Sequence, residues 1–322
     1  MYLAPLNFDR FFKKVFSDLG IAKAFIEDFL GVEIESIEEL NTTKKFTDNA
    51  AVVEFDFRCK IDSGYVIIDM QQCYKPDVSQ RFFLYHALNT GLQLESLPDK
   101  KLFIDPVTRQ TRVVKDYRRL DPVITLVWMV DDCLGFDHNF VSYSLLPHVV
   151  LDYFAQDISK ISVDELSKMH ASVAKDIGNN TKEIGFLSKN SLIFLFQKNI
   201  VKDKRLEGYK RWFEFAEKTK SKSNSREDFK KFCGNDVFEE MIRRLERSSL
   251  PEADIRYMQS EKALIKGVGD WQDEIKKESM EEGKREGMKE GKREGLEEAL
   301  QKLISSGMTE EEASKILFRD FA

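Results

Sequence analysis

Cysteine and histidine are scarce in this sequence, and neither is spaced as a metal site requires. The 322 residues include four cysteines (Cys59, Cys73, Cys133 and Cys233) without a CxxC pair, and four histidines without ligand spacing. This pattern argues against a disulfide framework and against a structural zinc site. It predicts a reducing, cytoplasmic setting.

Long hydrophobic runs are also missing. The longest, "VITLVWMV" at residues 123–130, has eight residues, whereas a membrane span needs about 20. Asp9 and Arg10 interrupt the early apolar run, so no signal peptide is expected. The sequence therefore predicts a protein without a membrane partner, in which residues 123–130 form a buried strand.

Positive charge is not in excess, because the net charge is −6. With 42% hydrophobic and 33% charged residues, the composition is that of a soluble globular protein. Any contact with nucleic acid must then come from local basic patches, and a loop at 100–119 and the segment 198–231 are candidates. Aromatic residues at helical spacing in 198–231 favour the alternative for that segment, a helix with its aromatics in the core.

The first half of the chain carries helix and strand patterns. Apolar spacing predicts a helix from Phe8 to Phe16 and a second helix that Asp18 caps and Gly31 ends. An edge strand follows. Residues 53–62, "VEFDFRCKID", alternate as a strand with one dry and one wet face, and Ser63-Gly64 form the turn to the strand "YVIIDMQQ".

The rest of the chain completes the predicted architecture. A capping box of Asp77 and Gln80 opens a helix before the strand at 123–130, so the core is a mixed α/β fold with a central sheet flanked by helices. Strand signals fade after 155, and "SLIFLFQKNIV" is interpreted as a helix. We expect domains at 1–155 (core), 156–265 (helical region) and 266–322 (a charged tail with Gly at every fourth position and a Thr309–Glu312 capping box).

The predicted hairpin places two acids on one face. A Ser63-Gly64 turn pairs Arg58 with Asp69, so Asp56 and Asp69 become diagonal neighbours on the wet face, roughly 7 Å apart. Two such carboxylates repel unless a hard cation, Mg²⁺ or Mn²⁺, neutralises them. Gln71 could hold an attacking water but not act as a charged base. The alternative that these acids are ordinary solvated residues stays open.

These residues resemble a known family. An Asp, then Asp-x-Gln on the next strand, within helix–strand–strand–helix–strand order, resembles the PD-(D/E)XK nuclease superfamily. Within it, "FDRFFKKVF", "EFDFRCKIDSGYVIIDMQ", "RFFLYHALNTGLQL" and the Gly-rich tail are similar to Rpn-type recombination-promoting nucleases, also labelled transposases. The resemblance implies a restriction-endonuclease-like core with a helical C-terminal region.

The resemblance also implies roles for individual residues. Asp56 matches the first metal ligand, Asp69 the second, and the Met70 backbone carbonyl a third. Gln71 stands where many of these nucleases have a catalytic lysine, and Asp69 stands where this branch more often has glutamate. Arg81 matches an arginine that would clamp a phosphate beside the metal.

Two helix pairs are further candidates. Arg81 and Tyr85 share a helix face, and the alternative to a phosphate clamp is an arginine that packs over the sheet edge. Asp9 and Lys13 could also reach the hairpin, although an i,i+4 surface pair is the more frequent arrangement.

The expected function is that of a magnesium-dependent endonuclease acting on DNA, for which a double-strand cut would need a homodimer. Two other hypotheses stay open: a DNA-binding relative that has lost catalysis, and an interaction protein that acts through the charged tail.

Overall fold

The computed structural model describes most of the first 261 residues. The described ranges are 1–45, 52–72, 77–104, 107, 111–131, 134–145, 165, 168–169, 171, 182–205 and 208–261, with single residues or pairs between 284 and 309. Residue contacts divide the chain into two units, Met1–Gln259 and Ser260–Ala322. The predicted domain boundary at 155 and the tail capping box at Glu312 lie outside the described residues.

The two N-terminal helices form as predicted. Helix α1 spans Asp9–Phe16 and α2 spans Leu19–Leu30. The Asp18 side chain accepts hydrogen bonds from the backbone N–H groups of Gly20 and Ile21, and Gly31 ends α2 with a φ of 65°. A cap and a left-handed glycine are local signals, so the sequence suffices to predict them.

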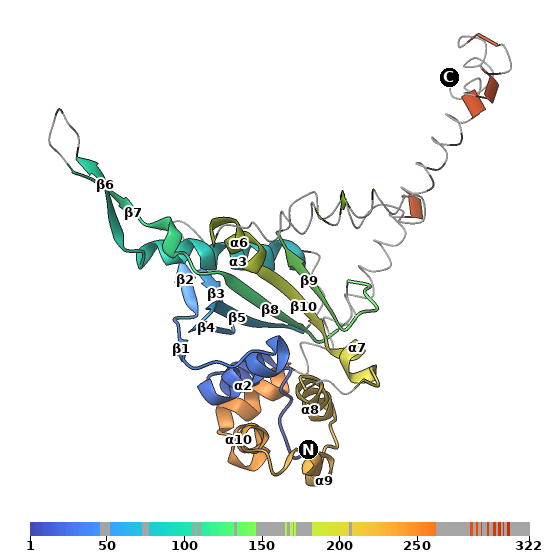
Figure 1. Ribbon diagram of the computed structural model, residues 1–322. Helices are drawn as coiled ribbons and strands as arrows, with labels where there is room; N and C mark the ends of the chain where they lie inside the picture. Colours follow the sequence, from blue (N-terminus) through green and yellow to red (C-terminus); the bar gives the residue numbers. More distant parts are fainter. Residues whose placement is uncertain are drawn as a thin grey trace. The chain divides into compact units, whose positions relative to one another are not determined.

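A six-stranded mixed sheet forms the centre of the described part of the first unit (Figure 1). Its strand order is β1 (Ile37–Glu39), β4 (Phe57–Ile61), β5 (Gly64–Gln71), β8 (Val123–Met129), β10 (Ser191–Phe196) and β9 (Phe140–Ser144). Strands β5, β8 and β10 are parallel, and the other neighbours are antiparallel. The prediction of an α/β protein with a central sheet is confirmed, and β1 is an edge strand as expected.

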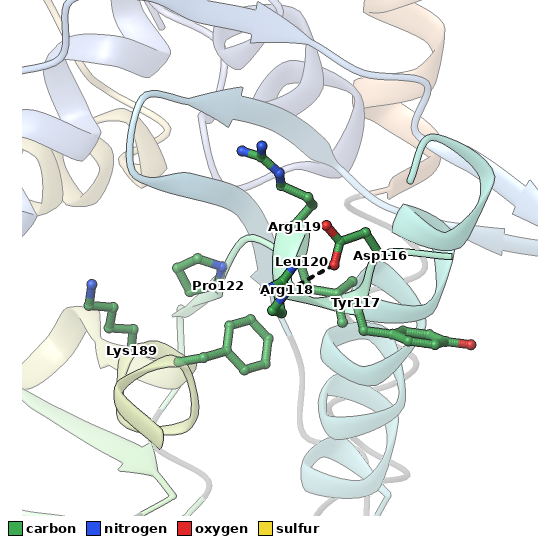
Figure 2. A pocket seen from close by; sticks show the side chains of 8 residues that line it. Asp116, Tyr117, Arg118, Arg119, Leu120, Pro122 and Lys189 are labelled. Atoms are coloured by element: carbon green, nitrogen blue, oxygen red, sulfur yellow. Dashed lines mark hydrogen bonds and ion pairs between the residues drawn. The ribbon is translucent and has the colours of Figure 1, made fainter. Parts of the chain in front are cut away.

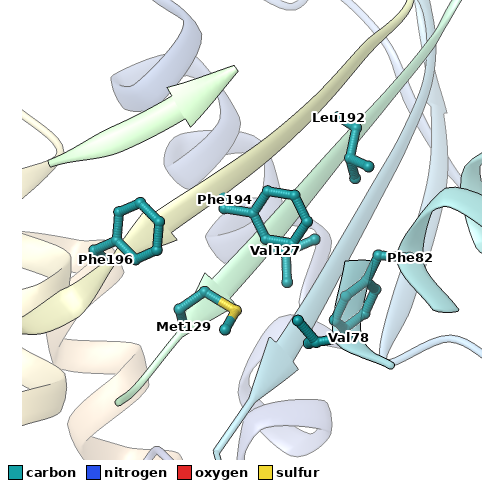
Figure 3. Packing of buried hydrophobic residues seen from close by; sticks show 7 residues of the cluster. All are labelled: Val78, Phe82, Val127, Met129, Leu192, Phe194 and Phe196. Atoms are coloured by element: carbon teal, nitrogen blue, oxygen red, sulfur yellow. The ribbon is translucent and has the colours of Figure 1, made fainter. Parts of the chain in front are cut away.

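Helices cover both faces of this sheet (Figure 1). Helix α3 (Val78–Leu92) connects β5 to the parallel β8, and α6 (Lys182–Lys189) directly precedes β10. They lie on one face, where the cluster of Figure 3 joins α3 to β8 and β10 through Val78, Phe82, Val127, Met129, Leu192, Phe194 and Phe196.

The N-terminal helices lie on the opposite face with α8 (Lys210–Lys220) and α10 (Asp236–Leu245). There, the ring of Trp128 lies 5.5 Å from Phe25 and 4.1 Å from Phe213, centroid to centroid. Trp212, Phe213 and Phe215 are buried, which confirms that the aromatics of segment 198–231 belong to the core.

The strand β10 corrects the interpretation of "SLIFLFQKNIV" as a helix. Its apolar run pairs with β8 on one side and β9 on the other, and only then does the chain turn into α7 (Gln197–Lys202). A short apolar run without flanking Gly or Pro fits a buried strand or a buried helix equally well, and tertiary pairing decides between them.

The predicted strand 53–62 is broken in two. Strand β3 (Val52–Glu54) pairs with β2 (Thr43–Lys45), whereas β4 begins only at Phe57, after a bend at Asp56. Ile61 pairs with Gly64, so the turn is Asp62-Ser63 and the register is shifted by two residues from the prediction.

The second face of β4 is not wet, because α3 covers it. Arg58 is 6% exposed and donates from Nε to the Asn89 Oδ1 of α3. Under this cover Arg58 is buried, whereas Lys60, the other basic residue of the alternating pattern, stays half-exposed.

The remaining elements differ in smaller ways. Asp77 precedes α3, but its side chain forms no capping hydrogen bond. The predicted loop 100–119 is a hairpin of β6 (Asp99–Ile104) and β7 (Thr111–Lys115), and the 3₁₀ turn η2 (Tyr117–Arg119) follows it. The short helices are η1 (Gln93–Glu95), α9 (Arg226–Phe229), η4 (Lys230–Phe232) and η5 (Arg247–Ser249).

The N-terminus closes the first unit. Tyr2 donates its backbone N–H to the Asn224 carbonyl and Ala4 donates to Leu245, both over 2.8 Å. None of the described helices combines the length and the apolar character needed to cross a bilayer.

Candidate active site

Asp56 and Asp69 lie together where β4 begins and β5 ends. The ladder between these strands pairs Phe57 with Ile68, and one further step along it brings Asp56 opposite Asp69. The turn predicted from the sequence makes the two acids diagonal neighbours. The observed register makes them direct neighbours, which is a closer approach than predicted.

Two hydrogen bonds fix this arrangement. Asp56 donates its backbone N–H to Asp69 Oδ1 over 3.1 Å, and Met70 donates its N–H to Asp56 Oδ2 over 2.8 Å. Each carboxylate therefore accepts a backbone proton from the opposite strand. The bend at Asp56 leaves its N–H outside the ladder, so this group is available for a side chain.

Burial gives this pair unusual electrostatics. The Asp69 residue is 3% exposed and the Asp56 side chain 9% exposed. Burial raises the pKa of Asp69 to about 7, against the opposing effects of the Asp56 N–H and the charge of Arg81. Burial and the negative charge of Asp69 raise the pKa of Asp56 well above its usual range. Such a pair favours a shared proton or a bound cation.

Lys13 of α1 approaches the pair from the N-terminal helix. Its Nζ lies 3.6 Å from Asp56 Oδ1, 2.7 Å from Glu54 Oε1 and 3.2 Å from Asp9 Oδ2. Burial alone would lower the pKa of this ammonium, but the hydrogen bond to Glu54 and the charges of Asp56 and Asp9 raise it overall. Lys13 thus forms the expected i,i+4 pair and also reaches the acids.

Gln71 and Arg81 meet on the α3 side of the sheet. Arg81 donates from Nη2 to Gln71 Oε1 over 2.5 Å. Its guanidinium carbon lies 5.7 Å from the centre of the Tyr85 ring and 4.5 Å from that of Phe82. The predicted shared face of Arg81 and Tyr85 is confirmed, and the aromatic rings hold the guanidinium against β5.

Two polar atoms of this cluster are buried without a hydrogen-bond partner. Among the described side chains, Asp69 Oδ2 and Arg81 Nε are in this state, together with the more distant Asn89 Nδ2. A buried carboxylate oxygen without a partner is costly, and such atoms in native proteins mark places where a water, an ion or a substrate completes the bonding.

The donor set suits a hard divalent cation. Asp56 and Asp69 supply carboxylate oxygens, including the unpartnered Asp69 Oδ2, and Mg²⁺ is commonly held by one or two carboxylates together with water. Within the described ranges, no group of three or more His, Cys, Asp or Glu side chains is arranged around a metal position. The residues therefore fit a two-carboxylate magnesium site and not a zinc site.

Lys13 and Glu54 belong to the cluster, although from the sequence Lys13 fits a surface pair and Glu54 is not a candidate. Their only signal is the i,i+4 spacing of Asp9 and Lys13, which fits a surface pair equally well. The bend at Asp56, which brings Glu54 to Lys13, has no signature in the alternating pattern.

Comparison of the chain with protein-family models, with curated proteins and with solved structures found no match. The geometry of the acids and their neighbours is therefore the basis of the functional argument.

Proposed function

We propose that this protein is a magnesium-dependent endonuclease that hydrolyses phosphodiester bonds in DNA. The observation that carries the proposal is the buried pair of Asp56 and Asp69, with one carboxylate oxygen left without a partner. The order of hairpin, helix α3 and parallel strand β8 around this pair supports it, because a PD-(D/E)XK core has the same order.

Each residue of the cluster is assigned a separate role. Asp56, Asp69 and the Met70 carbonyl would hold the cation, which when bound polarises a phosphoryl oxygen and lowers the pKa of a bound water. Gln71, oriented by Arg81, is assigned to position the attacking water. Arg81 is assigned to a phosphate oxygen, because a guanidinium matches phosphate geometry.

DNA would contact the protein through its basic segments. The β6–β7 hairpin and the turn after it carry more Lys and Arg than Asp, and contacts of this kind to phosphates need no base sequence. Cutting both strands at one site would need a homodimer.

A second candidate is a DNA-binding protein without catalysis. Lys13 favours it, because its ammonium already lies 3.6 Å from Asp56 and neutralises part of the acid pair. Gln71, which stands where many PD-(D/E)XK nucleases have a catalytic lysine, also favours a protein without catalysis.

Plasmid nicking with Mg²⁺ tests the proposal. Asp56→Asn and Asp69→Asn should each lower the nicking rate by at least about 100-fold, because each removes a charged ligand. Asp121→Asn is the matched control. The Asp121 side chain is 42% exposed, and the residue lies just before β8, at the end of the sheet away from the acid pair.

The outcomes separate the two candidates. A wild-type protein that binds DNA in a salt-sensitive way but does not nick it would support the second. If both site variants nick as fast as wild type, the catalytic assignment is wrong.

A further inference from the structure

A pocket of about 710 Å³ lies beside the segment that leads into β8 (Figure 2). Leu120 and Pro122, just before β8, form one wall, and Phe186 and Lys189, at the end of α6, contribute to another. In the sheet Asp69 is aligned with Val127, so Pro122 lies about 16 Å away along the strand direction. The pocket is therefore separate from the candidate active site.

The walls of the pocket are held in place by buried amides. Asn190 accepts the Val123 N–H over 3.0 Å and donates to the Phe186 carbonyl over 2.7 Å, which ties α6 to the start of β8. Gln93 donates to the Asp121 carbonyl and accepts its N–H, each over 2.9 Å. Both side chains are at most 8% exposed, so the pocket is fixed by the fold.

The charge of the pocket is positive, unlike that of the chain as a whole. Arg118, Arg119 and Lys189 line it with one acid, Asp116, which lies 3.1 Å from Arg118 Nε. In the described part of the chain, neither Arg119 nor Lys189 forms an ion pair. Figure 2 shows Lys189 on one side of Pro122 and Arg118 with Asp116 on the other.

The remaining lining is apolar or aromatic. Leu120, Pro122 and Phe186 provide carbon surface, and the ring of Tyr117, which is 62% exposed, lies at the rim. Cations suit a phosphate and an aromatic wall suits a flat heteroaromatic ring. A volume of this size is ample for a ligand of nucleotide dimensions.

We propose that this pocket binds a nucleotide unit, with its phosphate attracted by the positive charges of Arg119 and Lys189 and its base against Phe186. The unit can come from a free nucleotide or from a nucleic-acid strand, since both present the same phosphate and base. The assignment does not depend on the acid pair or on hydrolysis.

Binding to the full-length protein in EDTA tests the proposal, with inorganic phosphate, adenosine monophosphate and a short single-stranded oligonucleotide as probes. The double variant Arg119→Gln/Lys189→Gln should bind the nucleotide about tenfold more weakly or worse, because the pocket loses two positive charges. The control Arg247→Gln/Lys168→Gln removes one arginine and one lysine at exposed positions outside the pocket and outside both basic segments, and should bind as wild type does.

Salt dependence gives a second readout. If the source is a strand, the slope of log affinity against log salt should fall by about 1.4 in the pocket variant, as expected for two lost contacts to a single strand. Binding of the free nucleotide with an unchanged slope for the oligonucleotide would identify the free nucleotide as the source, and would equally support the pocket.

Three results would overturn the proposal: no binding of either nucleotide probe, equal weakening in the pocket variant and the control, or equal affinity for phosphate and for nucleotide. Asp69→Asn should leave nucleotide binding in EDTA unchanged. A wild-type protein that binds the nucleotide but does not nick plasmid would count against the endonuclease alone, and one that nicks plasmid but does not bind the nucleotide would count against the pocket alone.

Discussion

Replacing Asp69 by asparagine should stabilise the protein at alkaline pH. The pKa of this buried carboxyl is raised to about 7 in the folded state, against about 3.9 in an unfolded chain. Between these values the folded state holds a proton that the unfolded state has released, so Asp69 makes the protein less stable as pH rises. Above pH 7 the loss is complete.

The size of the effect follows from the shift. The raised pKa of Asp69 corresponds to a loss of stability of about 4 kcal/mol at pH 8, of which roughly a third is already present at pH 5. The asparagine side chain would keep an oxygen for the Asp56 N–H but carry no charge. The stability gained by Asp69→Asn should therefore be roughly 2–3 kcal/mol larger at pH 8 than at pH 5.

Urea unfolding at the two pH values measures this difference, with Asp121→Asn as the exposed control. Added Mg²⁺ at pH 8 should stabilise wild type more than Asp69→Asn, since a ligand that binds only the folded state stabilises it. A stability gain that is the same at pH 5 and pH 8 would refute the reasoning, because Asp69 would then not be ionising inside the protein.

Three further changes test the fold by urea unfolding. Gly64→Ala should destabilise by about 2 kcal/mol or more, because Gly64 has a φ of 149° and a Cβ there would lie 2.4 Å from the Pro122 carbonyl oxygen; an unchanged midpoint would contradict the close approach. Asp18→Ala should cost about 1–2 kcal/mol through loss of the α2 cap, whereas Asp18→Asn should retain most of it, and equal losses would argue against capping. Asn190→Ala should cost about 1–3 kcal/mol, because the Val123 N–H loses its acceptor, and a neutral result would remove the tie that shapes the pocket.

The parts of the fold that the sequence predicts correctly rest on local signals. Asp18 and Gly31 bound a helix through contacts within a few residues, and the apolar run at 123–130 is buried wherever it lies. The run at 191–196 carries no such signal, because only pairing with β8 and β9 makes it a strand. The prediction failed there because the deciding contacts are distant in sequence.

The candidate site was predictable in its residues but not in its geometry. The spacing of Asp56 and Asp69 identifies two acids on one hairpin. The observed turn lies one position earlier than the predicted one, and the two acids are therefore directly opposite each other instead of diagonal. The approach of Lys13 depends on how α1 packs against the sheet, which no local pattern encodes. The alternating pattern alone could not show that α3 packs against the second face of β4 and buries Arg58.

The backbone bonds of Tyr2 and Ala4 to Asn224 and Leu245 bear on the order of events during synthesis. Residues at the start of the chain find their partners only after more than two hundred others have been made, whereas domains otherwise tend to fold from the N-terminus as they emerge. Leu3 and Leu6, buried in the finished fold, would stay accessible to chaperones until α10 leaves the ribosome. A shortened chain that stops before α8 should expose this apolar segment and aggregate.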